Sequence, residues 1–172
     1  MRDLVHNLGV ALAGRSVLVL GAGGAARGVL GPMLEQRPAR LVVANRTLAN
    51  AQALVELFEP LGRIEAVVPE TLADRFDVVI NATSAGLAGE QPPWPSTPFA
   101  DGAFAYDMTY SDEPTGFMRW AKACGAARTA DGMGMLIEQA AESFFLWRGV
   151  RPATAPLFAA LRAGPGDAAP AL

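Results

Sequence analysis

The chain has little of several residues on which particular protein classes depend. Among its 172 residues there is one cysteine, one histidine and one lysine. The lone Cys124 excludes an intramolecular disulfide framework. The net charge is −3 and basic residues form no run, so nothing favours a nucleic-acid partner. No apolar run approaches the roughly 20 residues that span a bilayer, so no membrane partner is expected.

Composition favours a single α/β domain. Apolar residues make up 51% of the chain and charged residues 18%, which suits a sheet buried on both faces. We expect one domain over residues 1–162, with a lead-in helix in 1–13, and a flexible Gly/Pro/Ala-rich tail over 163–172. The N-terminus lacks the apolar core of a secretory signal, so a cytoplasmic location is expected.

Strand-like and helical patterns alternate along the chain. Strands are expected at 16–20, 40–44, 64–68, 77–81, 103–107 and 127–130. Helices are expected at 2–12, 24–36, 48–58, 115–123, 133–147 and 154–163, and a proline-rich loop at 89–98. This alternation predicts a doubly wound, mainly parallel six-stranded sheet with helices on both faces.

A glycine turn joins the first of these strands to the helix after it. Gly21, Gly23 and Ala26 fill the three small positions of the Rossmann dinucleotide fingerprint. Such a turn also simply caps strands, but the strand before it and the helix after it favour a cofactor. Backbone N–H groups at the start of the helix then face the pyrophosphate. The expected cofactor contacts of this turn are Gly21, Ala22, Gly23, Gly24 and Ala25.

The residues after the second strand select the nucleotide. An acidic side chain at this point accepts hydrogen bonds from the ribose 2′-hydroxyl of NAD. This chain has Asn45, Arg46 and Thr47 instead. A guanidinium can bind a 2′-phosphate with two hydrogen bonds, whereas a carboxylate would repel it. The alternative is that Arg46 is only a solvated surface charge. Because no acidic side chain stands at this point, the sequence predicts that the cofactor is NADP.

Polar and soft side chains follow the fourth and fifth strands. Thr83 and Ser84 either line the cofactor or satisfy the backbone of their own turn, and the sequence leaves both readings open. Met108 offers an apolar wall for a nicotinamide ring, and Tyr110 offers an amphipathic contact for a substrate. In parallel sheets these carboxyl ends lie on one rim, where ligands bind. Taken alone, a methionine and a tyrosine after a strand are more often core residues.

Five motifs in order resemble the shikimate dehydrogenase family. They are Gly-Ala-Gly-Gly-Ala-Ala (21–26), Asn-Arg-Thr (45–47), Asn-Ala-Thr-Ser-Ala-Gly (81–86), Tyr-Asp-Met-Thr-Tyr (106–110) and Asp-Gly-Met-Gly-Met-Leu-Ile-Glu-Gln-Ala-Ala (131–141). The resemblance covers residues 3–160 and implies reversible, NADPH-dependent reduction of 3-dehydroshikimate to shikimate. It also implies that Gly132 and Met135 lie beside the nicotinamide and that Tyr110 and Gln139 contact the substrate.

Two departures from the family pattern matter. The family usually has a second basic residue shortly after the position of Thr47, where this chain has Asn50, so a weaker preference for NADP over NAD is expected. Its catalytic Lys and Asp belong to an N-terminal substrate domain that this sequence lacks. The only lysine, Lys122, ends a helix remote from the rim. We therefore expect a cofactor domain that is inactive alone and meets shikimate or 3-dehydroshikimate only with that domain.

The sequence is also compatible with other functions. A non-enzymatic nucleotide sensor or scaffold module, or the cofactor domain of a quinate dehydrogenase, fits the same residues, and the oligomeric state stays open. His6 is expected on a surface and Cys124 in the core. No His/Cys/Asp cluster has the spacing of metal ligands. Helical spacing predicts that most of a later apolar set is core: Met133, Met135, Phe144, Phe145 and Trp147.

Overall fold

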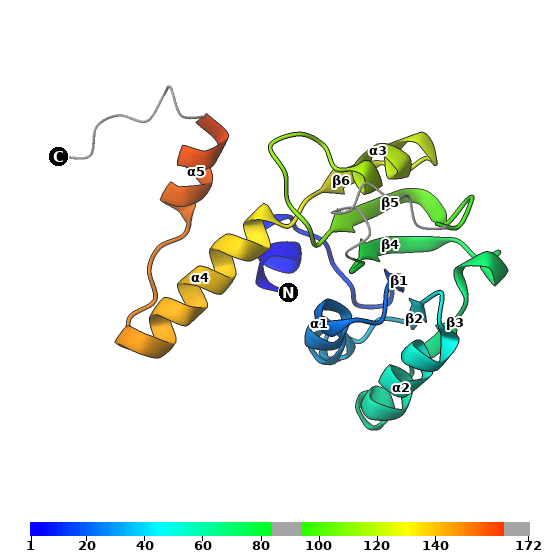
Figure 1. Ribbon diagram of the computed structural model, residues 1–172. Coiled ribbons are helices and arrows are strands. Elements are labelled where there is room, and N and C mark those ends of the chain that lie inside the picture. The colour runs from blue at the N-terminus through cyan, green and yellow to red at the C-terminus, as the bar shows by residue number, and fades with distance from the viewer. Residues whose placement is uncertain (84–93, 164–172) are drawn as a thin grey trace.

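The chain forms an open parallel sheet with helices on both faces (Figure 1). The computed structural model describes residues 1–83 and 94–163. The sheet has the order β3-β2-β1-β4-β5-β6, and every strand pair in the described residues is parallel. The strands are β1 (Ser16–Leu20), β2 (Arg40–Ala44), β3 (Glu65–Val67), β4 (Phe76–Asn81), β5 (Phe99–Asp107) and β6 (Arg128–Ala130). The predicted α/β fold is confirmed, with a sheet that is entirely parallel rather than mainly so.

Alternate residues of the central strands face two separate cores. Val17 and Val19 of β1 face the core that contains α1 (Gly24–Glu35) and α2 (Leu48–Phe58). Leu18 and Leu20 face the opposite core, which contains α3 (Gly116–Ala123). Because both faces are covered, β1 and β2 are almost continuously apolar. Short 3₁₀ turns at Glu59–Leu61 (η2) and Pro69–Thr71 (η3) flank β3.

The expected N-terminal helix over 2–12 is wrong in length. Only Asp3–Asn7 is helical, as a single π-helical turn, η1. The turn stops because Gly9 adopts a left-handed φ of 67°, which a continuing helix does not allow. Val10 and Leu12 are instead buried in the core beside α1, where they lead the chain into β1.

The start of β5 also differs from the expectation. The strand begins at Phe99, four residues before the expected start, because Phe76 N–H donates to the Pro98 carbonyl and extends the pairing of β4 with β5. Most of the predicted loop, residues 84–93, lies outside the described residues. So does the predicted tail from residue 164.

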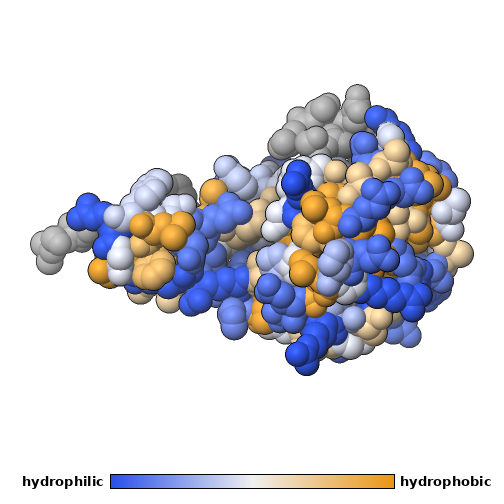
Figure 2. Space-filling view, turned by 90° about the horizontal axis from the view of Figure 1, so that it is seen from below, coloured by the Kyte–Doolittle hydropathy of each residue, from blue (hydrophilic) through white to orange (hydrophobic). Residues whose placement is uncertain are grey.

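The last two helices form an arm beside the sheet rather than a layer over it (Figures 1 and 2). The first, α4 (Met133–Arg148), packs chiefly against η1 and α5 (Ala155–Ala163). The prediction that Phe144, Phe145 and Trp147 are core residues is therefore wrong: Trp147 is 80% exposed, and both phenylalanines are exposed too. Helical spacing identified a shared face, but no described element covers it. Of the helices in the described residues, none is long and apolar enough to cross a membrane.

Candidate cofactor site

The carboxyl ends of four strands meet at one edge of the sheet, called here the rim. The ends are Leu20, Ala44, Asn81 and Asp107 of β1, β2, β4 and β5. The chain runs outward from β1 to β2 and β3 on one side, and then returns to β4 on the other side of β1. Ligands of open parallel sheets bind where the strand order reverses in this way, so the rim above β1 and β4 is the candidate site.

Gly21 is a glycine because two turns touch at this point. Its φ is 102°, and a Cβ on it would lie 2.9 Å from Thr83 Cγ2 and 3.0 Å from the Ala82 carbonyl oxygen. Its N–H donates to the Ala44 carbonyl at 2.8 Å, and Ala82 N–H donates to Leu20. The turn after β1 is thus fixed against the ends of both neighbouring strands.

In the described part of the chain, no side chain caps the backbone N–H groups at the start of α1. Gly23 is the N-cap and makes no side-chain capping bond, and no acidic residue lies in the first turn. Among the described residues, no atom comes within 4 Å of a Cβ added at Gly23 or Gly24. Ala26 is fully buried against the core. The open backbone and the positive end of the helix form a site suited to a phosphate group.

The residues after β2 leave a cation exposed. Asn45 Nδ2 donates to the Thr47 carbonyl at 2.8 Å, which fixes the turn. Thr47 is the N-cap of α2, but its hydroxyl makes no capping bond. Arg46 is exposed and forms no ion pair with any residue in 1–83 or 94–163. Asn50 is exposed in the first turn of α2.

A buried Asn–Asp pair connects the ends of β4 and β5. Asp107 is 1% exposed and accepts hydrogen bonds from Asn81 Nδ2 at 3.0 Å, Thr109 N–H at 3.1 Å and the Thr115 hydroxyl at 2.6 Å. Asn81 Oδ1 accepts from the Thr83 hydroxyl at 2.7 Å. The pair therefore shapes both rim turns. The Thr83 hydroxyl donates its proton within the turn after β4.

Sequence reasoning did not single out this pair. The signal was present, because Asn81 and Asp107 are polar residues that directly follow the apolar runs Val78–Ile80 and Ala103–Tyr106. Of the two residues whose role was left open, Thr83 makes the turn contact just described, and Ser84 lies outside the described residues.

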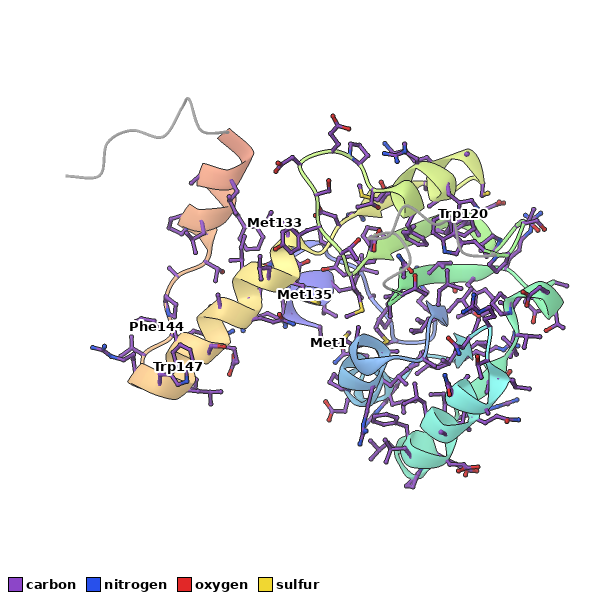
Figure 3. All side chains as sticks on the ribbon, in the orientation of Figure 1. Met1, Trp120, Met133, Met135, Phe144 and Trp147 are labelled. Atoms are coloured by element: carbon purple, nitrogen blue, oxygen red, sulfur yellow. The ribbon has the colours of Figure 1, made fainter. Side chains whose placement is uncertain are left out.

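The turn before α4 rests on the turn after β5. Gly132 N–H donates to the Thr109 carbonyl at 2.8 Å, and a Cβ on Gly132 would overlap the Met108 carbonyl. Met108 and Met135 are half-buried and share an apolar cavity of about 20 Å³ that Tyr106 and Val29 also line. In Figure 3, Met135 lies at the end of α4 nearest the sheet, while Phe144 and Trp147 lie at the far end. Three predicted nicotinamide contacts are therefore close together.

The two predicted substrate contacts do not line this apolar cavity. Tyr110 is 52% exposed and lines a polar rim cavity of about 390 Å³ with Asn81, Asp107 and Arg119. Gln139 is exposed on α4 and is not among the residues that line this cavity.

The remaining reactive side chains lie off the rim. Lys122 is in the last turn of α3, which runs back from the rim, so it lies toward the opposite edge of the sheet. Cys124 packs against the core on the α3 side, and burial raises the pKa of its thiol. His6 is exposed on η1. In residues 1–83 and 94–163, no group of His, Cys, Asp and Glu is arranged to hold a metal ion.

Fold and rim together define a dinucleotide-binding domain of the Rossmann type. Comparison with known proteins identifies the family to which this domain belongs. A family model described as shikimate / quinate 5-dehydrogenase matches residues 3–88, and one for the shikimate 5′-dehydrogenase C-terminal domain matches residues 132–162. The chain belongs to the shikimate dehydrogenase family.

Individual relatives agree with this assignment. The chain is 62% identical to a shikimate dehydrogenase (NADP(+)) of Alkalilimnicola ehrlichii over 94% of its own length and 60% of the relative's. It is 54% identical to that of Methylococcus capsulatus over 95% and 59%. The chain thus spans about 60% of the length of these curated relatives.

Solved structures show the same partial match. An Ael1 enzyme from Pseudomonas putida superposes with a TM-score of 0.82 at 46% identity, over 92% of this chain and 58% of that one. Shikimate 5-dehydrogenase from Thermus thermophilus, in complex with NADP(H) and shikimate, superposes with a TM-score of 0.76 at 35% identity, over 93% and 59%.

Proposed function

We propose that this chain binds NADP(H) as the cofactor domain of a shikimate dehydrogenase-like oxidoreductase, which interconverts 3-dehydroshikimate and shikimate. The observation that carries the proposal is Arg46 at the end of β2, which is exposed and has no ion pair in the described part of the chain, at a point where an NAD-selective domain has a carboxylate. The names of the relatives and the ligands of the Thermus thermophilus structure support the same reading.

Different rim residues bind different parts of the cofactor. The backbone of Gly23 and Gly24 at the start of α1 receives the pyrophosphate, because its N–H groups are unpaired and its surroundings are open. Arg46 and Thr47 bind the 2′-phosphate. Met108, Gly132 and Met135 hold the nicotinamide end. The bound cofactor supplies a hydride to a ketone or accepts one from an alcohol.

Among the described residues, the rim offers no lysine to complete that reaction. Reduction of a ketone needs a proton for the developing alkoxide. The only lysine, Lys122, lies toward the opposite edge of the sheet. We therefore propose that the 172-residue chain does not turn over shikimate alone, and that Tyr110 and Gln139 contact substrate only when a separate substrate domain supplies the catalytic Lys and Asp.

Two measurements on the purified 172-residue chain test this proposal. Nicotinamide fluorescence should report saturable binding of NADPH that is tighter than binding of NADH. Shikimate oxidation with NADP⁺, followed by the appearance of NADPH, should not exceed the rate without protein. Absence of NADPH binding would overturn the cofactor assignment, whereas measurable turnover would overturn the claim that catalysis needs a second domain.

A further inference from the structure

The direction in which α4 leaves the sheet is set by few apolar contacts. Of its 16 residues, the buried apolar ones besides Gly134 are Ile137 and Ala141. The large apolar side chains near its far end, Phe144–Trp147, are exposed. Yet this helix holds Met135 and Gln139, so its orientation decides where both of these residues lie relative to the rim. Another interaction must fix that orientation.

Glu138 connects α4 to the segments on either side of it. Its side chain is 7% exposed. Oε1 accepts hydrogen bonds from Asn7 Nδ2 of η1 at 3.2 Å and from the Thr154 hydroxyl, just before α5, at 2.9 Å. Oε2 pairs with Arg2 Nε at 2.9 Å and with Arg151 Nη2 at 3.5 Å. One carboxylate thus joins three segments of the chain.

The connection continues to the sheet through η1. Asn7 Nδ2 also donates to Asp3 Oδ1 at 3.1 Å, and Asp3 Oδ2 accepts a hydrogen bond from the Tyr106 hydroxyl of β5 at 2.7 Å. Gly134 of α4 fits directly against the Asp3 carboxylate, where any Cβ would overlap it. A polar path therefore runs from β5, through η1, to Glu138.

The carboxylate is ionised under ordinary conditions. Burial acts to raise the pKa of Glu138, but the hydrogen bonds from Asn7 and Thr154 and the charge of Arg2 outweigh it and hold the pKa below its ordinary value. Hydrogen bonds to a charged, buried group are strong and directional, so they fix a helix angle better than two small apolar contacts do.

We propose that Glu138 is a positioning residue for the nicotinamide end of the site: it holds α4 at the angle that keeps Met135 and Gly132 beside Met108. Glu138 itself touches neither cofactor nor substrate in this arrangement. The proposal rests on the proposed function, because it concerns where one end of NADP(H) binds.

The test separates the two ends of the cofactor. Glu138→Gln keeps the size of the side chain but removes its charge, and Glu142→Gln is the matched control, one turn further along at an exposed position that contacts Arg151. Each variant and the wild-type chain are titrated with NADPH and with 2′-phospho-ADP-ribose, which lacks the nicotinamide.

A positioning role predicts a split between the two ligands. Glu138→Gln should weaken NADPH binding by about 3- to 30-fold and reduce the change in nicotinamide fluorescence. Its affinity for 2′-phospho-ADP-ribose should stay within about twofold, and Glu142→Gln should change neither affinity. If Glu138→Gln does not fold, Thr154→Val, which removes one of the donors, should show the same split.

Other outcomes overturn the proposal. Equal loss of both ligands would mean that Glu138 only stabilises the fold, and unchanged NADPH binding would mean that α4 needs no such connection. A control variant that behaves like Glu138→Gln would also contradict it. If the wild-type chain binds neither ligand, the proposed function fails first and this proposal falls with it. Binding of 2′-phospho-ADP-ribose alone would overturn only the nicotinamide assignment.

Discussion

Single residues on the rim divide into those that shape the backbone and those left free for a ligand. Asn45 and Thr83 use their side chains to fix their own turns. Arg46, in contrast, is exposed and has no partner in the described part of the chain. A guanidinium that is exposed at the end of β2 is available to a phosphate, so we propose that this one side chain determines selectivity for NADP.

Replacing Arg46 by alanine should change the nucleotide preference rather than the fold. We expect Arg46→Ala to weaken NADPH binding by about 10- to 100-fold, the range for a lost hydrogen-bonded charge pair. NADH binding should change by less than about threefold, because NADH has no 2′-phosphate. Equilibrium titration with both nucleotides measures the two effects.

Two further variants make this test specific. Arg75→Ala removes an exposed arginine just before β4, at the opposite edge of the sheet, and should leave both affinities unchanged. Asn50→Arg places a second cation in the first turn of α2 and should raise the preference for NADPH. Equal losses of NADPH and NADH in Arg46→Ala would show that Arg46 does not read the 2′-phosphate.

Gly21 and Gly28 offer a matched pair for the glycine turn. Gly21→Ala forces a Cβ toward Thr83 and the Ala82 carbonyl at a φ of 102°, and should lower the free energy of unfolding by about 1–3 kcal/mol. Gly28→Ala lies in α1 with open space around it, and should raise that free energy by about 0.5–1 kcal/mol. Urea unfolding of both variants checks the signs; a neutral Gly21→Ala would show that the two turns are not in close contact.

At the scale of elements, the strands and the α4 arm differ in what holds them. The central strands β1, β2 and β4 are covered on both faces by α1, α2 and α3, and their apolar residues are buried. The arm depends more on the hydrogen bonds and ion pairs of Glu138. Its stability should therefore respond to pH through that carboxyl.

Acid should remove the contribution of Glu138. Its folded pKa is below the ordinary value of 4.5, so the stabilisation is complete above the unfolded pKa and is lost as the pH falls through the folded pKa. At neutral pH the wild-type chain should exceed Glu138→Gln in free energy of unfolding by about 1–3 kcal/mol. This difference should shrink in acid, and chemical unfolding at several pH values measures it.

The exposed Glu142→Gln variant is again the control, and its difference from the wild-type chain should be small at every pH. A Glu138 difference that grows as the pH falls would contradict the account, because it would require a raised pKa in the folded state.

The sequence predicted elements best where local pattern and tertiary burial agree. The strands β1 and β2 have the predicted bounds, because apolar runs bounded by turns are typical of a doubly covered sheet. The N-terminal helix was too long, because Gly9 ends it. The face of α4 was assigned to the core, because periodicity shows that residues share a face but not whether another element covers it.

On the scale of the whole molecule, the candidate site collects residues that are far apart in the sequence. Motifs at each strand end predicted Gly21, Met108 and Gly132, which the fold does bring to the rim. Asn81 and Asp107 could be seen as polar strand ends, but the sequence does not show that residues 26 positions apart pair with each other. The contact of Glu138 with Asn7, 131 positions away, was not predicted for the same reason. Such partners become visible only in the folded chain.

The chain also spans only about 60% of the length of these curated relatives, and the described part corresponds to a cofactor domain. Among the described residues, the rim presents the open backbone at the start of α1, an arginine without an ion pair and an apolar end, whereas the lysine lies elsewhere. Binding without turnover is the behaviour that this arrangement predicts.

A crystal structure of the 172-residue chain with NADPH would test the central claim most directly. The account predicts the pyrophosphate at the start of α1 beside Gly23 and Gly24, the 2′-phosphate within hydrogen-bond distance of Arg46, and the nicotinamide against Met108 and Met135. A nucleotide bound away from the rim, or one whose 2′-phosphate points away from Arg46 into solvent, would contradict it.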